Sequence, residues 1–530
     1  MKPSALSSLA LLSSFIIGIL GSCNQSYPPT DLSAEALIPI PVSVLSDGNQ
    51  FQLRHDMNIY VEAGNQEVAL AGEYLASILG PATGFDLEVE ETIVPPPKGQ
   101  IYLHLDATDR ELGKEGYVLE ITDSGIDLKA PDAAGLTMGI ATLRQLLPPE
   151  IESQTIQDID WMLSTGTIRD YPEYEYRGAM LDVARHFFPV DVVKRYIDYL
   201  AMYKFNRLHL HLSDDQGWRI EIRSWPRLTT IGGSTEVGGG KGGFYTQDEY
   251  KQIVEYARIR HIMVVPEIDM PGHTNAALAS YPELNCDNRS PELYTGTEVG
   301  FSTLCTTREV VYQFVEDVIG ELAAITPGDY IHIGGDESHV TPMEDYIPFI
   351  ERVQDIVQAT GKTIIGWDEI AHARLVPGTI VQYWEEGDNA RKGIEQGVRV
   401  LMSPATKAYI DMQYDSTSRI GLHWAAYIEV DEAYNWDPAT FEEGISRDDI
   451  LGVETALWAE TITDLKDIDY LAFPRLPGYG EIGWSPAAQR DWEDYSQRLG
   501  AQQDRFEIMG IGYYPSDRVS WGSKAPSPNE

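Results

Sequence analysis

The stretch DYIHIGGDES, residues 329–338, ends an apolar run with two glycines and two adjacent carboxylates, Asp336 and Glu337. A short apolar run bounded by glycines is typical of a buried strand and the turn that ends it. Neighbouring carboxylates repel each other, and their burial is costly unless each is paired or one is protonated. The stretch therefore predicts a functional site at the end of a strand.

Similar runs recur between residue 176 and residue 460. Eight strand candidates result, at residues 176–185, 205–215, 261–270, 329–337, 363–370, 379–386, 397–405 and 450–460. Amphipathic helical periodicity separates several of them, at residues 190–204, 246–260 and 306–325. The link between the last two candidates is long and irregular, so we expect that a regular helix is missing there.

Eight buried strands alternating with helices predict a (β/α)8 TIM barrel, an α/β fold. A doubly wound sheet is the alternative, but it would carry a glycine-rich phosphate turn after an early strand, and the sequence has none. Ahead of the barrel, short strand-like runs alternate with two helical stretches, which predicts a smaller α+β domain. We assign residues 36–170 to this domain, residues 171–515 to the barrel and residues 516–530 to a C-terminal tail.

The first 23 residues have the layout of an export signal, with Lys2 ahead of the apolar run LALLSSFIIGIL. The run ends in LGSC at Cys23, which resembles a bacterial lipobox, and residues 24–35 are polar and contain prolines, as a tether would. We expect an exported lipoprotein, periplasmic or on the cell surface, anchored to a membrane through Cys23. The alternative is a plain signal or an uncleaved anchor in which the cysteine is incidental.

Charge and cysteine content bear on three questions: polyanion binding, a disulfide and a metal site. Acidic residues outnumber basic ones by 82 to 39, giving a net charge of -43, and such a surface repels nucleic acid and anionic lipid headgroups, which argues against binding to polyanions. Cys286 and Cys305 enclose one polar loop, and in an exported protein such a pair predicts a disulfide. No histidine stands at metal-ligand spacing near them, so we predict no metal site.

The carboxyl ends of the strand candidates carry polar and aromatic residues, and barrel enzymes build their sites at this rim. These residues are Arg185, Asp214, Asp215, Glu267, Asp269, Asp336, Glu337, Trp367, Trp384, Trp458 and Glu460. Indole faces cover the apolar face of a sugar, whereas carboxylates and guanidinium groups bind its hydroxyls, so the rim predicts a sugar site. Paired carboxylates are also the usual machinery of glycoside hydrolysis. Adjacent residues, however, cannot easily flank a glycosidic bond from opposite faces.

Six motifs in order resolve this difficulty. LDVARHF (181–187), HLSDDQGWR (211–219), PEIDMPGH (266–273), HIGGDE (332–337), GWDE (366–369) and ALWAE (456–460) resemble those of family 20 glycoside hydrolases, the β-N-acetylhexosaminidases. The similarity covers nearly all of the mature chain, including IPIPVSV (38–44) and GLTMGIATLRQLL (135–147) in the smaller domain. The resemblance implies the same fold and exo-acting removal of terminal β-linked N-acetylglucosamine or N-acetylgalactosamine, without a cofactor.

In that family the 2-acetamido oxygen of the substrate is the nucleophile and forms an oxazolinium ion, with net retention. The resemblance implies that Glu337 is the general acid and then the base, and that Asp336 holds the acetamido N–H. Only one enzyme carboxyl then has to reach the leaving oxygen, so the other can stand beside it. Tyr409 would donate its hydroxyl to the acetamido oxygen.

The remaining roles implied by the resemblance concern binding. Arg185 would hold two ring hydroxyls, and Asp214, preferred over Asp215, would act with His273 to orient Glu337. The pocket walls and the contacts to the fourth and sixth hydroxyls would come from Trp367, Trp384, Trp458, Asp411 and Glu460. Trp424 is a candidate for extending the site toward the leaving group.

Three other functions stay open on the sequence alone. They are release of a disaccharide, as in some members of the same family, capture of glycans without cleavage, and metal-dependent hydrolysis. The sequence leaves undecided the choice between the two N-acetylhexosamines, the natural glycan, the membrane that holds the anchor and the oligomeric state.

Replacing Cys23 with Ser tests the lipid anchor. Without the thiol no lipid can be attached, so we expect the variant to leave the membrane fraction and appear in the soluble fraction on cell fractionation. Equal retention of the variant and the unaltered chain in the membrane fraction would remove the lipoprotein prediction.

Overall fold

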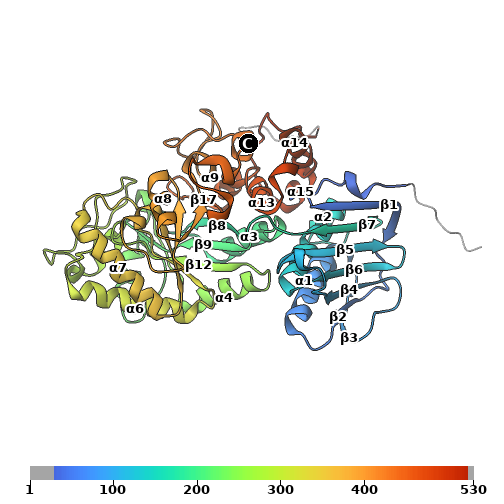
Figure 1. Cartoon of the computed structure of the whole chain (residues 1–530), viewed down its shortest axis with the longest axis horizontal. Coiled ribbons are helices and arrows are strands. Elements are labelled where there is room, and N and C mark those ends of the chain that lie inside the picture. Colours follow the sequence, from blue (N-terminus) through green and yellow to red (C-terminus); the bar gives the residue numbers. More distant parts are fainter. Residues whose placement is uncertain (1–28, 523–530) are drawn as a thin grey trace, which may run out of the picture.

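The computed structural model describes residues 29–522, so Cys23 and the export signal lie outside the described residues. Two domains stand side by side, and helices from the C-terminal part of the chain lie at their junction (Figure 1). Within the described residues, no helix combines the length and the apolar character needed to span a bilayer.

The smaller domain is a seven-stranded mixed sheet with strand order β1-β7-β5-β6-β4-β2-β3. Its strands are β1 (Ser43–Gln52), β2 (Ile59–Glu62), β3 (Val89–Thr92), β4 (Gln100–Leu105), β5 (Tyr117–Thr122), β6 (Gly125–Ala130) and β7 (Met162–Asp170). Two helices, α1 (Gln66–Thr83) and α2 (Ala133–Leu146), pack their apolar faces on the sheet in one core. The α+β prediction is confirmed, although the sequence did not reveal β3, β7 or most of β1.

The larger domain is a closed barrel of eight parallel strands, as predicted. The strands are β8 (Tyr176–Asp182), β9 (Arg207–His211), β12 (Met263–Glu267), β13 (Tyr330–His332), β14 (Thr363–Trp367), β15 (Ile380–Tyr383), β16 (Arg399–Met402) and β17 (Ile450–Leu457). The longer helices between successive barrel strands are α3 (Val190–Met202), α4 (Gln247–Arg258), α6 (Glu309–Ile325), α7 (Met343–Ala359) and α8 (Gly387–Glu395). Every strand candidate is one of these strands.

Short elements fill the connections. Those before β17 are η1 (Leu32–Ala34), η2 (Arg110–Leu112), η3 (Pro149–Glu152), β10 (Ser213–Asp214), β11 (Gly217–Trp218), η4 (Leu228–Gly232), η5 (Val237–Gly239), α5 (Asn275–Ser280), η6 (Pro282–Leu284) and η7 (Asp368–His372). The link from β16 to β17 holds only α9 (Ala405–Ala408), α10 (Val430–Tyr434), α11 (Pro438–Phe441) and η8 (Arg447–Asp449), so the regular helix is indeed missing. After β17 come α12 (Leu465–Ala472), α13 (Leu476–Trp484), η9 (Ala487–Gln489), α14 (Trp492–Ala501) and α15 (Gln503–Met509).

Two expected boundaries lie elsewhere in the structure. Leu32 is only 1% exposed and belongs to the core of the smaller domain, so the folded chain begins before residue 36. Val519 is buried, and the Trp521 ring lies 4.8 Å from the Tyr513 ring, so the packed chain continues past residue 515. In both cases an apolar side chain in a polar segment reaches a neighbouring core, which composition alone does not show.

The predicted disulfide is present between Cys286 and Cys305. It joins the ends of the loop between η6 and α6, on the side of the barrel where the strands end. Ser302 in this loop donates a hydrogen bond to Asp215 at 2.5 Å, so the loop is also tied to the rim.

The two domains meet around a buried carboxylate, Asp170, at the end of β7. Its Oδ2 accepts hydrogen bonds from Lys204 Nζ (2.7 Å), Tyr117 Oη (2.8 Å) and Trp484 Nε1 (2.9 Å). Lys204 and Trp484 belong to the barrel domain and Tyr117 to the smaller domain, so one anion joins the two. A buried ion pair of this kind is sensitive to loss of either partner, because the remaining charge is left uncompensated.

Replacing Asp170 with Asn tests this junction. The change keeps the shape but leaves the Lys204 ammonium without its counter-charge, so we expect a loss of about 3–5 kcal/mol of unfolding free energy in urea denaturation. The matched control is Glu175→Gln, which breaks an exposed ion pair with Arg399 and should cost about 0–1 kcal/mol. Indistinguishable unfolding midpoints for the two variants would contradict the role of Asp170.

Candidate active site

Asp336 and Glu337 lie just beyond β13, at the barrel rim, and both face His273. His273 Nε2 is 3.3 Å from Glu337 Oε2 and 3.6 Å from Asp336 Oδ2. Asp336 is buried, whereas Glu337 is a quarter exposed at its side chain. One imidazole therefore contacts both carboxylates of the adjacent pair.

The two glycines before this pair are required by its backbone path. Gly334 and Gly335 have φ of +65° and +107°, and a Cβ on Gly334 would fall 1.8 Å from Asp269 Oδ1. That same oxygen accepts a hydrogen bond from the Gly335 amide at 3.0 Å. Glu337 itself has φ of +46°, which is rare for a residue with a side chain and is typical of functional sites.

Asp214 contacts His273 more closely than Asp215 does. The distance from His273 Nδ1 is 3.2 Å to Asp214 Oδ1 and 3.9 Å to Asp215 Oδ2. Asp214 Oδ2 also lies 2.8 Å from the Arg185 guanidinium. Burial would raise the pKa of Asp214, but Arg185 and His273 outweigh it and hold the pKa far below its usual range. Asp214 is thus an anion that connects Arg185 with the imidazole beside Glu337.

Aromatic rings form one side of the site. Trp384 and Tyr409 stack in parallel with ring centroids 6.4 Å apart, and Trp424, which is 54% exposed, meets both rings edge-on. The Arg185 guanidinium lies 4.8 Å from the Trp458 ring, on which it stacks. Trp384 and Trp458 directly follow β15 and β17, whereas Tyr409 and Trp424 lie in the long β16–β17 link, and the fold brings these rings together.

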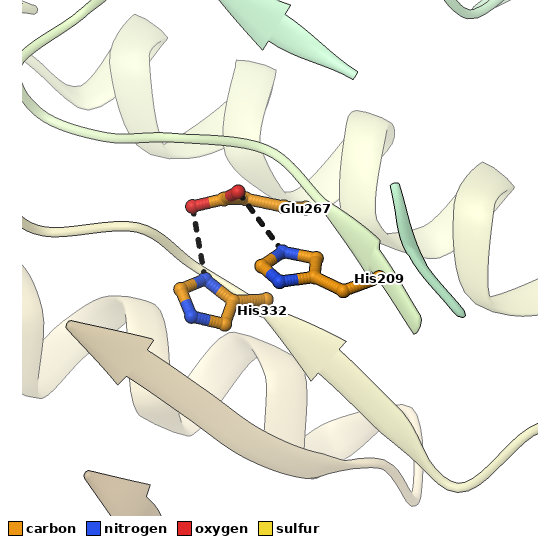
Figure 2. Close-up of side chains that lie close together, drawn as sticks. All are labelled: His209, Glu267 and His332. Carbon is orange, nitrogen blue, oxygen red and sulfur yellow. Dashed lines mark ion pairs between the residues drawn. The ribbon is translucent and has the colours of Figure 1, made fainter. Parts of the chain in front are cut away.

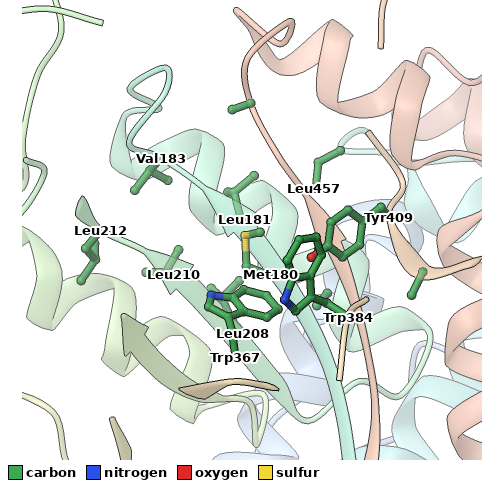
Figure 3. Close-up of a cluster of buried hydrophobic side chains, with 14 of the residues drawn as sticks. Met180, Leu181, Val183, Leu208, Leu210, Leu212, Trp367, Trp384, Tyr409 and Leu457 are labelled. Atoms are coloured by element: carbon green, nitrogen blue, oxygen red, sulfur yellow. The ribbon is translucent and has the colours of Figure 1, made fainter. Parts of the chain in front are cut away.

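Trp367 is more buried than Trp384, Trp424 and Trp458. It is 1% exposed and is one of the buried side chains drawn in Figure 3, and its ring centroid lies 5.8 Å from that of Trp458. Its indole N–H donates to Glu267 at 2.9 Å. Trp367 is therefore held by a buried carboxylate, and its role as a wall of the sugar pocket stays a prediction.

Several buried polar atoms at the rim have no hydrogen-bond partner within the described residues. They include Arg185 Nε, Asp336 Oδ1, both carboxylate oxygens of Asp411 and Glu460 Oε2. Burial and the neighbouring Glu460 raise the pKa of Asp411 well above its usual range. Buried polar groups are normally hydrogen-bonded, so a cluster of unpaired ones fits a ligand rich in hydroxyl and amide groups.

Three residues outside the predicted set also support the site. Tyr346 donates its hydroxyl to the Gly335 carbonyl at 2.6 Å, and Glu369 accepts the Trp384 indole N–H at 3.1 Å. His211 contacts Asp214 at 2.8 Å and Glu267 at 2.5 Å. The alternation LHLH at residues 208–211 is the one signal that could have found His211, because it puts both histidines of an apolar strand on the same face.

The sequence argument against a metal site does not hold in three dimensions. Histidines distant in the chain come together with carboxylates, for example His209, Glu267 and His332 (Figure 2). Spacing along the sequence failed as a criterion because each residue comes from a different strand. Within this set both imidazoles lie 3.0 Å from the Glu267 carboxylate, so direct contact with Glu267 accounts for the cluster.

A cavity of about 890 Å³ lies at the opposite end of the barrel, where the strands begin. Both domains contribute to its lining, which includes Glu115, Tyr174, Arg207 and Tyr330. None of the residues predicted for the sugar site lines this cavity. The predicted chemistry is therefore confined to the carboxyl rim.

A closed parallel barrel with adjacent carboxylates, an imidazole and indole rings at its carboxyl rim defines a glycoside hydrolase. The chain belongs to glycosyl hydrolase family 20. The model of the family's catalytic domain matches residues 174–346 and 338–487, and that of the family's domain 2 matches residues 34–171.

Relatives share this architecture along almost the whole chain. A β-N-acetylhexosaminidase of Cellulomonas fimi is 39% identical over 93% of this chain and 98% of its own length. The solved family 20 β-N-acetylhexosaminidase of Streptomyces coelicolor A3(2) is 50% identical, with a TM-score of 0.89 over 94% of this chain and all of the other. A mutant β-hexosaminidase of Streptomyces plicatus, solved with its product GlcNAc, is 51% identical, with a TM-score of 0.89 over 93% of this chain and 99% of the other.

Replacing Glu337 with Gln tests its assignment as the general acid. We expect kcat to fall by about 10²- to 10⁴-fold on substrates with poor leaving groups, and by less on activated aryl substrates, whose leaving groups need no proton. The control is Glu344→Gln, the same change at an exposed carboxylate of α7, which should leave both rates unchanged. An equal loss of rate on both substrate types would contradict the assignment.

Proposed function

We propose that the protein hydrolyses terminal, non-reducing β-linked N-acetylhexosamine residues of oligosaccharides and glycoconjugates, acting from the chain end with retention. The observation that carries this proposal is the placement of Asp336 and Glu337. Both side chains face the same imidazole, so both approach a substrate from one side. An acid and a separate enzyme nucleophile would need carboxylates about 5–5.5 Å apart across the glycosidic bond. A nucleophile supplied by the substrate removes that need.

The proposed reaction has two steps. First, the 2-acetamido oxygen attacks the anomeric carbon while Glu337 gives its proton to the glycosidic oxygen, which leaves with the aglycone. Second, the Glu337 carboxylate takes a proton from a water molecule, which attacks the oxazolinium ion and opens the ring. The two inversions at the anomeric carbon give net retention, and Glu337 ends protonated as it began.

Asp336 stabilises the positive charge of the oxazolinium ion that forms between these two steps. Burial and the neighbouring Asp269 raise the pKa of Asp336 well above its usual range. A positive charge on the acetamido group favours the ionised carboxylate, because an opposite charge nearby stabilises the charged form. Asp336 then accepts the acetamido N–H and stabilises the oxazolinium ion as it forms.

The remaining rim residues bind and orient the sugar. Tyr409 donates its hydroxyl to the acetamido oxygen and so aligns the nucleophile. Trp384 and Trp458 cover the apolar faces of the sugar and its acetamido group. The unpaired polar atoms of Arg185, Asp411 and Glu460 bind the ring hydroxyls. These roles give the unpaired atoms of Arg185, Asp336, Asp411 and Glu460 partners on the sugar.

We also propose that the enzyme works at a membrane surface, held through a lipid on Cys23. Support comes from the sequence LGSC that closes the apolar run and from the polar segment after it. Glycans terminating in either N-acetylhexosamine would then be cleaved outside the cytoplasm.

The test compares an aryl 2-acetamido-β-glucoside with the corresponding plain β-glucoside, using the chain without residues 1–23. Only the acetamido substrate carries the proposed nucleophile, so we expect turnover of that substrate alone in a steady-state release assay. Similar rates on both would show that an enzyme carboxylate attacks. No turnover of either substrate would favour disaccharide release or glycan capture instead.

A further inference from the structure

A line of contacts continues from the active site into the centre of the barrel. The line starts with Glu337, His273 and Asp214. It continues to His211, whose Nε2 lies 2.8 Å from Asp214 Oδ2. The other ring nitrogen of His211, Nδ1, lies 2.5 Å from Glu267 Oε2. Asp214, His211, His273 and Glu267 are each no more than 2% exposed, so water does not compete for these contacts.

We propose that His211 and Glu267 are positioning residues for the general acid. Together they fix the Asp214 carboxylate so that it engages His273, and His273 in turn aligns Glu337 for proton transfer. The proposal rests on the proposed function only in treating Glu337 as the acid. No proton travels along the line, because Glu337 gives its proton to the leaving oxygen and regains it from water.

The contacts of Asp214 explain why His211 is needed. Its Oδ1 accepts the Asp215 amide at 2.6 Å and faces His273, whereas its Oδ2 faces Arg185 and His211. Arg185 also lies against the Trp458 ring and is expected to bind substrate hydroxyls, so it is shared between Asp214 and the substrate. His211 is fully buried and is assigned no contact with the substrate, so it is placed to hold Asp214 from inside the barrel.

Glu267 in turn fixes His211. Its Oε2 faces His211 and His209, and its Oε1 faces His332 at 3.0 Å and Trp367 Nε1 at 2.9 Å (Figure 2). These four partners come from β9, β13 and β14, while Glu267 closes β12. A carboxylate held on both oxygens by three strands cannot rotate, so the His211 ring is clamped between Glu267 and Asp214.

The charge states agree with this geometry. Burial alone would lower the pKa of His211, but Glu267 and Asp214 outweigh it and hold the pKa well above its usual range. Likewise, burial would raise the pKa of Glu267, but His211, His332 and His209 together lower it well below its usual range. His211 is therefore an imidazolium that donates from both ring nitrogens, one to each carboxylate.

The general acid depends on this support because its own position is loosely held. Glu337 is partly exposed, and its backbone amide is 3.4 Å from Glu369. Among the described side chains, His273 is the one that contacts the Glu337 carboxylate at ion-pair distance. If Asp214 turns, His273 loses its partner, and the proton on Glu337 is no longer directed at the leaving oxygen.

The test uses Glu267→Gln in the chain without residues 1–23, with two 2-acetamido-β-glucosides: one with a 4-nitrophenyl leaving group and one with a methyl leaving group. Because acid catalysis matters most for the methyl substrate, we expect its kcat to fall by about 10- to 100-fold. The aryl substrate should lose less than about threefold, and KM should stay within about twofold for both, since Glu267 touches neither. Equal loss on both substrates, or no loss on either, would overturn the proposal.

The matched control is Glu454→Gln. Glu454 is also 1% exposed inside the barrel and accepts from His209 Nδ1 at 2.8 Å, on the side of His209 away from Glu267. Its loss disturbs the barrel interior but leaves His211 and Asp214 in place, so we expect no dependence on the leaving group. The same leaving-group dependence in Glu454→Gln would overturn the proposal, because it would then reflect general damage to the barrel.

A second variant keeps the test decisive if Glu267→Gln does not fold, as judged by circular dichroism. In His211→Asn, the shorter amide still reaches Glu267 from near the Nδ1 position but cannot reach Asp214. It should show the same selective loss on the methyl substrate, and an unselective change would overturn the proposal. Failure of the unaltered chain to cleave either acetamido substrate would instead contradict the proposed function, so the two failures are distinguishable.

Discussion

A carboxylate buried inside a β-barrel has to be met by hydrogen-bond donors, and this constraint organises the centre of the molecule. Glu267 stands at the end of β12, where side chains from several strands converge, and imidazoles and one indole surround it. Asp214 is likewise paired with hydrogen-bond donors, with Arg185 on one side and His273 on the other. A line of buried polar contacts thus runs from Glu267 through His211, Asp214 and His273 to Glu337, and apolar side chains surround this line.

The rest of the architecture brings the Glu337 end of this line of contacts to the barrel rim, where a sugar can bind. Parallel strands bring their carboxyl ends to one rim, so Asp336 and Glu337 share a site with rings that directly follow β15 and β17 and with rings of the β16–β17 link. Gly334 and Gly335 allow the chain to pass over Asp269 and present the two acids. The smaller domain contributes no residue that we assign to the site, and it is joined to the barrel through the buried Asp170.

Much of this was predictable from local pattern and motif order. The eight strands were visible because short apolar runs alternate with amphipathic helices, and the rim residues because they directly follow those runs. The depth of Trp367 was not predictable, since its contact with Glu267 joins two strands that are far apart in sequence. Spacing along the chain likewise could not predict that His209 and His332 lie together, because they belong to strands that are far apart in sequence.

The sequence by itself determined the fold class, the order of the strands and the identity of the adjacent acids, because periodicity and motifs are local properties of a chain. Tertiary structure alone decided that Asp214 rather than Asp215 lies nearer to His273, and that His211 and Glu267 stand behind it. Those contacts depend on which side chains point inward at the same height of a closed barrel. That height is set by the register between strands, which no single stretch of sequence contains.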